Sequence, residues 1–179
     1  MNIYEYEPPR DSKKATGVVV ILFSLAAGLF LFTILINIPF SWVLQLIAII
    51  SLTAAIFITT RYLTKSFLYS INQTDGGSLD LDVLEITNGG KKHITVCRIG
   101  LAGIEESFVI NKTDKASLAT EENLIKKAKQ DRVKIFNYCP DINPVKYSII
   151  IGEECGEKYL IKLTPDDKLC EYLNIKNHK

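Results

Sequence analysis

The chain has 179 residues, with 21 Lys and Arg against 20 Asp and Glu, so its formal net charge is +1. A balance this even gives no electrostatic reason to expect a nucleic acid as a partner. Hydrophobic residues make up 47% of the chain, and the segment from Ala15 to Thr60 contains no charged residue at all. The residues from Ser66 onward are enough for one soluble domain of ordinary size.

The charge-free segment predicts a membrane hairpin. At about 1.5 Å per helical residue it would be roughly 70 Å long, twice the ~30 Å hydrocarbon core of a bilayer. It is too long for one straight span and fits two spans joined by a turn over 37–42, where Pro39 breaks a helix and Trp42 suits a membrane–water interface. We therefore expect a leader over 1–14 and a transmembrane helical hairpin over 15–62, with spans at about 17–36 and 42–60.

The flanking charges predict the orientation of this hairpin. Arg10, Lys13 and Lys14 precede the first span, Arg61 and Lys65 follow the second, and the turn between the spans carries no charge. Under the positive-inside rule, both termini are then cytoplasmic and the protein is a two-span protein of the cell membrane.

Small and polar residues in the two spans predict how the spans pack. Small residues four positions apart let membrane helices approach closely, and polar side chains can form hydrogen bonds across them. Counted outward from Pro39, the matching positions fall at equal or nearly equal depth in the two spans: Ser24, Gly28 and Thr33 in the first, and Ala55, Ser51 and Gln45 in the second. We expect these residues to pack together, with a Thr33–Gln45 hydrogen bond. The alternative is that such residues are simply common in membrane helices.

The absence of charge within the spans also bears on function. Ionisable residues inside a membrane usually mark ion or proton pathways. The hairpin is therefore expected to act as an anchor or as a docking surface for another membrane protein, rather than as a transport path.

After Lys65 the sequence changes to short β-rich segments separated by turns. A change in the alternation of apolar residues at Leu84 indicates a β-bulge. Residues 111–131 read as an insertion, a loop and a short helix with Thr120 as its N-cap, and Thr164-Pro165-Asp166-Asp167 begins a C-terminal amphipathic helix with Thr164 as the cap. The seven predicted strands are 66–71, 79–87, 91–98, 104–110, 133–138, 146–151 and 158–163.

Four strands, then three, then a C-terminal helix is the order of the pleckstrin-homology-like fold. The chain resembles bacterial membrane proteins in which two transmembrane helices precede such a domain. The resemblance implies an α+β protein whose residues 66–179 form a cytoplasmic, mostly-β barrel of about seven strands capped by the C-terminal helix. It also implies binding of lipid headgroups, peptides or proteins. A generic α+β domain is the alternative.

One property of some members of this family is missing from the sequence. Phosphoinositide-binding members carry basic residues around the loop between the first two strands. Here that loop, residues 72–78, contains one acidic residue and no basic residue, which argues against inositide recognition of that kind. The nearest basic residues are Lys65, Lys91 and Lys92.

A cluster of basic residues near the insertion is the main candidate for a binding patch. It could contact the anionic inner leaflet, at about 1 kcal/mol per base near the surface, or an acidic partner. The alternative is the solvated face of a short helix whose field is reduced by Glu121, Glu122 and Asp131. The cluster consists of Lys126, Lys127, Lys129, Arg132 and Lys134.

Two residue pairs are candidates for chemistry. His93 and Cys97 share a strand and could form a thiolate–imidazole pair, although four strand residues span about 13 Å. Asp80 and Asp82 could hold a divalent metal, although exposed strand acids are common. Neither pair has an evident third partner, and no phosphate-binding glycine loop or nucleophile elbow is present. We therefore expect no catalytic, cofactor or metal site.

Four cysteines, Cys97, Cys139, Cys155 and Cys170, have no metal-binding spacing and read as small buried hydrophobic residues in a reducing compartment. Taken together, the sequence predicts a non-enzymatic, membrane-anchored cytoplasmic module that binds a protein or lipid partner at the inner leaflet. One alternative is an accessory subunit that docks on a larger membrane complex through the hairpin. The other is a membrane-tethered enzyme using the pairs named above.

Overall fold

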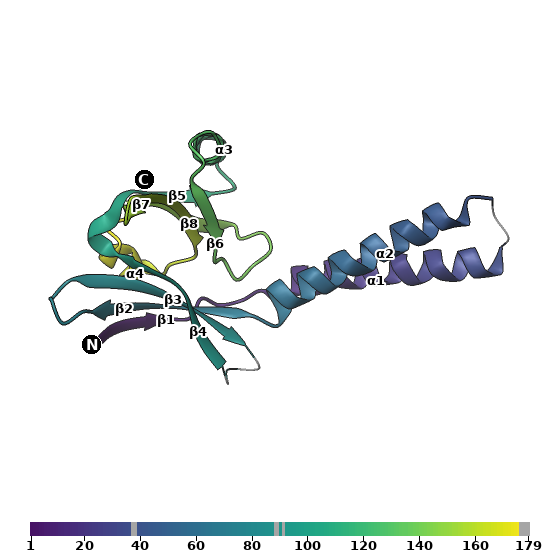
Figure 1. The fold of residues 1–179 in the computed structure, drawn as a ribbon, viewed down its shortest axis with the longest axis horizontal. Helices are drawn as coiled ribbons and strands as arrows, with labels where there is room; N and C mark the ends of the chain where they lie inside the picture. The colour runs from purple at the N-terminus through teal and green to yellow at the C-terminus, as the bar shows by residue number, and fades with distance from the viewer. Residues whose placement is uncertain (37–38, 88–89, 91, 176–179) are drawn as a thin grey trace. The chain divides into compact units, whose positions relative to one another are not determined.

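The computed structural model describes residues 1–36, 39–87, 90 and 92–175. The chain divides into two compact units (Figure 1). One is Arg10–Lys65, which we call the hairpin unit. The other joins Met1–Pro9 to Ser66–Lys179, and we call it the sheet unit. The α+β class is confirmed: the described residues form two long apolar helices, eight strands in two sheets and further helices in the sheet unit.

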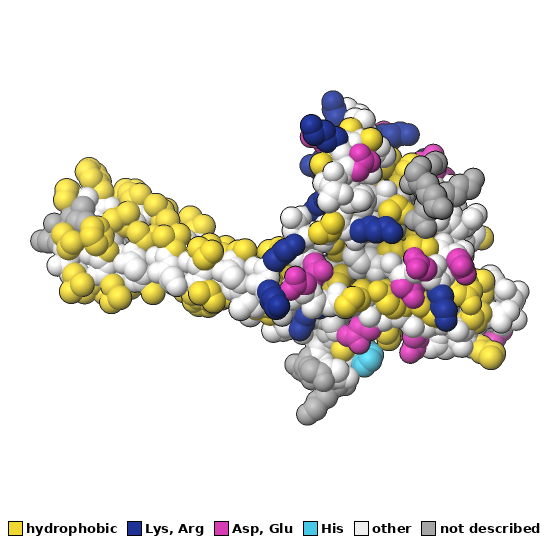
Figure 2. Space-filling model, turned by 180° about the vertical axis from the view of Figure 1, so that it is seen from behind, with side chains coloured by type: hydrophobic (Ala, Val, Ile, Leu, Met, Phe, Trp, Pro, Cys, Tyr) yellow, Lys and Arg dark blue, Asp and Glu magenta, His cyan; other side chains and the backbone are white. Residues whose placement is uncertain are grey.

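The hairpin unit contains α1 (Ser12–Leu35) and α2 (Ser41–Ile58), and α2 continues as a π-helical turn over Thr59–Leu63. Both helices are long and apolar enough to cross a membrane. Large apolar side chains cover their surface, as Figure 2 shows, an arrangement that water disfavours and lipid accommodates. The predicted pair of helices is therefore present. Asn37 and Ile38 of the predicted turn lie outside the described residues.

The contact between α1 and α2 uses small side chains spaced three, four or seven residues apart, the spacing of a coiled-coil seam. Two predicted members, Ser51 and Ala55, are buried in it. On α1 the buried residues are Ala15, Val19 and Ala26, and on α2 they are Ala48, Ser51 and Ala55. Small residues at these positions let the two backbones approach closely.

The other expected hairpin residues differ from the prediction. Ser24 and Gly28 are exposed, and a side chain at Gly28 would meet no atom within 4 Å. Thr33 donates to the carbonyl of Phe30 at 2.8 Å instead of pairing with Gln45. The local carbonyl is always within reach of a helical threonine hydroxyl, so this bond forms without a partner helix.

The first sheet contains β1 (Asn2–Tyr6), β2 (Ser66–Gln73), β3 (Leu79–Thr87) and β4 (Lys92–Gly100), in the order β1-β2-β3-β4. All three pairings are antiparallel. The expected bulge is found between Val83 and Leu84, and the extra residue, Val96, is on β4. The tip of the β3–β4 hairpin, including Lys91, lies partly outside the described residues.

β1 corrects the predicted leader. Residues 2–6 form an edge strand of the sheet unit rather than a separate segment, and α1 already begins at Ser12. Tyr4 and Tyr6 point to the core face, opposite Ile71 and Tyr69 of β2. The hairpin unit is therefore an insertion between two strands that are hydrogen-bonded neighbours.

The second sheet contains β5 (Ile104–Asn111), β6 (Lys134–Asn137), β7 (Lys146–Glu154) and β8 (Glu157–Leu163), in the order β5-β7-β8-β6. β5 follows β4 through a short 3₁₀ turn, Leu101–Gly103, and β6 pairs parallel to β8. Each of the seven predicted strands is present. The sheets do not close into a barrel, because in the described part of the chain no strand pairing joins one sheet to the other.

The insertion is a longer helix than expected. α3 spans Lys115–Gln130, and its N-cap is Asp114, whose carboxylate accepts from the amides of Ala116 and Ser117 at 3.1 and 3.2 Å. The expected cap, Thr120, lies inside the helix and donates to the Ala116 carbonyl. Aspartate is at least as good an N-cap as threonine, so the earlier position prevails.

The C-terminal helix α4 (Asp167–Tyr172), in contrast, begins two residues later than expected. Asp166, and not Thr164, is its N-cap and accepts from the amide of Leu169 at 2.9 Å. The predicted apolar positions Leu169 and Leu173 are fully buried, whereas Tyr172 is exposed.

The core of the sheet unit has two layers. The larger layer lies between the two sheets and includes residues of both, together with Leu169 and Leu173 at α4. The smaller one lies on the other face of the second sheet, beneath α3, and includes Ala128, Tyr147 and Leu160. The second sheet is therefore covered on both faces, which explains why residues 147–150 of β7 are all buried and do not alternate with exposed ones.

Candidate functional site

The predicted basic cluster lies along the end of α3 and the start of β6. Lys126, Lys127 and Lys129 are exposed on the helix, and Arg132 follows it with a left-handed backbone (φ 56°). Dark blue side chains gather over α3 in Figure 2. Lys134 forms an ion pair with Glu157 of β8. Four basic side chains of the cluster thus project from one short stretch of surface.

An ion pair beneath α3 changes the local charge balance. Glu121 turns inward and accepts from the ammonium of Lys162 at 2.6 Å, and both side chains are largely buried. Burial acts to raise the pKa of Glu121, but hydrogen bonds from Lys162 and Tyr147 outweigh it and leave that pKa lowered. Glu121 is therefore a carboxylate engaged in holding α3 on the sheet. Its negative charge therefore offsets the positive charge of the exposed lysines less directly than the sequence suggests.

Lys65 and Lys92, the other basic residues considered for lipid contact, are distant from this cluster in the sequence. Lys65 belongs to the hairpin unit, where its carbonyl accepts from Arg10. Lys92 is exposed at the first residue of β4.

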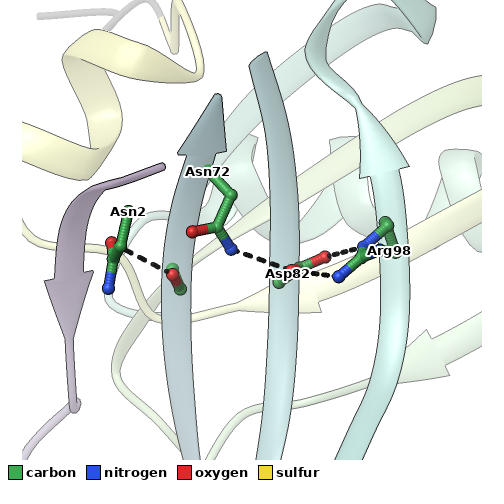
Figure 3. A network of polar contacts seen from close by, with 5 residues as sticks. Asn2, Asn72, Asp82 and Arg98 are labelled. Atoms are coloured by element: carbon green, nitrogen blue, oxygen red, sulfur yellow. Dashed lines mark hydrogen bonds and ion pairs between the residues drawn. The ribbon is translucent and has the colours of Figure 1, made fainter. Parts of the chain in front are cut away.

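The proposed metal pair Asp80–Asp82 is not arranged for a metal. Asp82 is buried on the first sheet, where both of its oxygens are occupied: Oδ1 by Arg98 at 2.6 Å, and Oδ2 by Arg98 and Asn72 at 2.8 Å each. Figure 3 shows this network across β2, β3 and β4, and a separate contact in which Ser70 donates to Asn2 of β1. The carboxylate therefore links β3 to both of its neighbouring strands.

His93 and Cys97 do not converge either. The His93 ring lies 3.1 Å from the Gly90 carbonyl oxygen and is exposed. Cys97 packs against the core between the sheets, and burial raises the pKa of its thiol. The bulge at Val96 lies between them, so the strand alternation that suggested a shared face is broken.

The four cysteines are free thiols. Cys139 is buried as expected, and Cys97 and Cys170 are partly buried. Cys155 is exposed instead, because it occupies the left-handed first position of the two-residue turn between β7 and β8 (φ 52°), followed by Gly156.

A contact that sequence reasoning missed joins the N-terminal strand to the C-terminal helix. The hydroxyl of Tyr4 donates to Oδ2 of Asp166, whose other oxygen caps α4. This bond to the carboxylate is the largest cause that raises the pKa of Tyr4 to about 12. The alternating tyrosines at positions 4 and 6 were the available signal for a strand.

A second missed contact closes the base of the hairpin unit. Arg10 donates to the carbonyl oxygens of Leu63 and Lys65 at 3.1 and 3.4 Å. The Leu63 carbonyl lies at the end of the second helix, so the guanidinium complements the negative end of the helix dipole there.

Three hollows in the described part of the sheet unit bear on the site. One, about 270 Å³, lies between the β1 exit at Tyr6 and Pro8, the start of β7 and the start of α4. A second, about 510 Å³, lies on α3 and is lined by Glu122, Asn123, Ile125, Lys126 and Lys129. The third, about 240 Å³, lies between β4 and β6, the edge strands at which the sheets remain open. We call this third hollow the seam groove.

Comparisons of the chain with protein-family models, with curated proteins and with solved structures find no match.

Proposed function

We propose that this protein is a membrane-anchored cytoplasmic binding module, which holds a pleckstrin-homology-like domain at the inner leaflet to recognise a protein partner or a lipid there. The observation that carries the proposal is the insertion of an apolar helical hairpin between β1 and β2, two paired strands of one folded unit.

The pairing of β1 with β2 supports the proposal that both flanks of the hairpin lie on the same side of the membrane. Main-chain hydrogen bonds between residues 2–6 and 69–72 require those segments to share one compartment. The basic residues at both flanks, including Arg10, Lys14 and Arg61, favour the cytoplasm as that compartment.

The architecture of the sheet unit supports a binding role. The seven strands after Lys65 are followed by a C-terminal helix that packs between the sheets, the order implied by the resemblance. β1 is an addition to that order. An anchor of this kind raises the effective concentration of a binding surface toward partners in the same membrane. The basic cluster on α3 and the open edges of the sheets supply surfaces for such contacts.

The proposal is tested by photo-crosslinking in native membranes. A benzophenone amino acid replaces one exposed residue at a time: Lys126 on α3, Ile94 on β4 and, as a control, Asp75 in the β2–β3 turn. We expect one surface to capture a defined protein or lipid, and the control position to capture nothing reproducible. If no surface captures a molecule and the purified protein turns over a small substrate, the proposal is wrong.

A second candidate function is supported by the exposed face of α1. Ser24 and Gly28 lie on that face with open space beside the glycine, a spacing that lets another membrane helix approach. The protein would then be an accessory subunit that docks through its hairpin. Gly28→Cys should crosslink to a partner helix in that case, whereas Ala26→Cys with Ala48→Cys should form only an internal disulfide.

A further inference from the structure

We infer that the hollow between the β1 exit, the start of β7 and the start of α4 binds a small zwitterion, a molecule with an ammonium group and an anionic oxygen group a few bonds apart. Two sources supply this chemistry, a free amino acid and the ethanolamine headgroup of a phospholipid. The inference rests on the proposed binding function and adds a class of ligand to it. We call this hollow the Ser148 hollow.

The first observation is a buried hydroxyl without a partner. Ser148 of β7 lines the hollow and is only 2% exposed, and within the described part of the chain its hydroxyl forms no hydrogen bond. Its neighbours Tyr147 and Ile149 belong to the layer beneath α3, so by the alternation of a strand Ser148 points between the sheets, as Ile150 does. Tyr6 also lines the hollow, and its hydroxyl has no partner among the described residues either. Burying such groups unpaired is costly, and a polar molecule in the hollow would remove that cost.

The size and lining of the hollow favour a compact molecule. Its volume of about 270 Å³ is about twice the ~150 Å³ of an engineered cavity that binds benzene and lies below the ~300 Å³ at which pockets for drug-sized ligands begin. β7 is paired on both sides, by β5 and β8, so a peptide cannot add here as a strand. Apolar side chains from several segments leave room for a small apolar part of the ligand: Pro8, Pro9, Val109, Pro144, Val145 and Pro165.

The second observation is a pair of opposite charges at the rim. Lys146 and Asp167 line the hollow and are exposed, and neither forms an ion pair with any described residue. In the seam groove, by contrast, Arg98 and Lys134 are each held in an ion pair. Asp141 also lines the Ser148 hollow and has an interaction of its own. An anionic oxygen can therefore bind Lys146 while an ammonium group binds Asp167.

The thiol of Cys170 lies in the same space. Cys170 of α4 lines the hollow and is partly buried. Burial raises the pKa of this thiol, Lys146 acts to lower that pKa, and Asp167 acts to raise it. Both rim charges are therefore within electrostatic reach of one point in the hollow, and a ligand that contacts both would cover the thiol.

The experiment measures how a ligand slows the alkylation of Cys170 by N-ethylmaleimide, followed by mass spectrometry on the full chain in a non-ionic detergent. Cys155 is the internal reference, because it is exposed in the β7–β8 turn and does not line the hollow. The probes are valine and two analogues of similar shape with one charge each: valinamide, which keeps the ammonium group, and 3-methylbutanoate, which keeps the carboxylate. Saturation-transfer NMR measures binding of the same probes without relying on the cysteine.

A second arm distinguishes the two sources. Glycerophosphoethanolamine takes the place of valine, and glycerol 3-phosphate is its analogue without the ammonium group. Alkylation is then compared in nanodiscs of phosphatidylglycerol with and without phosphatidylethanolamine. Protection by the ethanolamine compounds alone identifies a headgroup as the ligand, protection by valine alone identifies a free amino acid, and protection by both supports the shared chemistry.

We expect at least one zwitterion to slow alkylation of Cys170, to leave that of Cys155 unchanged, and to bind at least about tenfold more tightly than its single-charge analogues. If neither zwitterion binds more tightly than those analogues, the inference is wrong. If no probe binds up to about 10 mM, the hollow holds only water and the inference is equally wrong.

Substitutions at the hollow separate the two charges. Lys146→Gln should abolish the preference for valine over valinamide, and Asp167→Asn the preference over 3-methylbutanoate, because each variant lacks the group that the second charge contacts. Ser148→Ala should weaken binding of the zwitterion about fivefold. The matched control Lys168→Gln, on an exposed residue beside Asp167 that does not line the hollow, should change nothing. A loss in the control equal to that in Lys146→Gln would overturn the inference.

Failure here is distinguishable from failure of the proposed function. Photo-crosslinking is read from Lys126, Ile94 and Asp75, and none of these residues lines the Ser148 hollow. If crosslinking captures a defined partner while no zwitterion binds, only the ligand assigned to this hollow is wrong. If no surface captures a molecule and the purified protein turns over a small substrate, the proposed function fails whatever the hollow binds.

Discussion

The contact between Tyr4 and Asp166 offers a quantitative test of the N-terminal strand, on which the hairpin insertion depends. Removing the hydroxyl in Tyr4→Phe deletes a hydrogen bond to a carboxylate. Such bonds contribute about 1.5–3 kcal/mol, and because the pair is only partly buried we expect the lower end, about 1.5 kcal/mol.

Asp166→Ala removes the same bond and also the N-cap of α4, which contributes about 1 kcal/mol more. The double variant should be no less stable than Asp166→Ala alone, because the shared bond is lost only once. The expected coupling energy is therefore about 1.5 kcal/mol.

The assay is urea-dependent hydrogen exchange on the full chain in detergent, read on peptides that cover β2 and α4. The only tryptophan, Trp42, lies in the hairpin unit, so tryptophan fluorescence would not report on this contact. If the effects of Tyr4→Phe and Asp166→Ala on stability are additive to within about 0.3 kcal/mol, the two residues are not coupled. The reasoning is then refuted, and residues 2–6 are a loosely attached segment.

Three further outcomes follow from the structure. Ala55→Leu should overpack the contact between α1 and α2 and lower the stability of the hairpin by about 1–3 kcal/mol, whereas Gly28→Leu, which meets open space, should cost little; thermal unfolding in detergent compares them. Asp114→Ala should speed amide exchange in the first turn of α3, while Thr120→Ala should leave it nearly unchanged; a larger effect of Thr120→Ala would restore the sequence-based cap. Because the pKa of Tyr4 rises from 10.0 to about 12 on folding, its contribution is intact below pH 10 and lost as the pH rises toward 12; the stability difference between the natural chain and Tyr4→Phe should shrink over that interval, and a constant difference would contradict it.

Local patterns were sufficient for most elements. Each predicted strand after Lys65 is present because its residues alternate or form short apolar runs between turn residues. The bulge opposite Leu84 is present, but its extra residue, Val96, lies on β4 and not on the strand whose parity changes. The start of α4 was misplaced by two residues, since Thr164 and Asp166 are both good caps and the sequence alone does not rank them.

β1 could not be predicted from local pattern alone. Five residues with two inward tyrosines are too few to form a strand independently, and the partner β2 follows only after the whole hairpin unit. Strand pairing over such a separation depends on the folded unit. Tyr4 and Tyr6 therefore indicate a strand only when their partners Tyr69 and Ile71 are known.

The hairpin contact shows a different limit. Counting from Pro39 places residues at equal depth, but packing also depends on their direction around the helix. Ser24 follows the buried Val19 by five residues, which at 3.6 residues per turn rotates it by about 140°. The small residues of α1 that face α2 are Ala15 and Ala26. Matching residues by depth alone, without their direction around the helix, therefore selected the wrong face of α1.

The short connections between the units bear on the proposed function. Only residues 7–11 separate β1 from α1, two of them proline, and only Thr64 and Lys65 separate the π-helical turn from β2. The sheet unit is therefore joined by two short segments to a hairpin that we propose as a membrane anchor. A partner held in the same membrane gains the effective concentration that such an anchor supplies, whereas a free soluble peptide gains nothing from it.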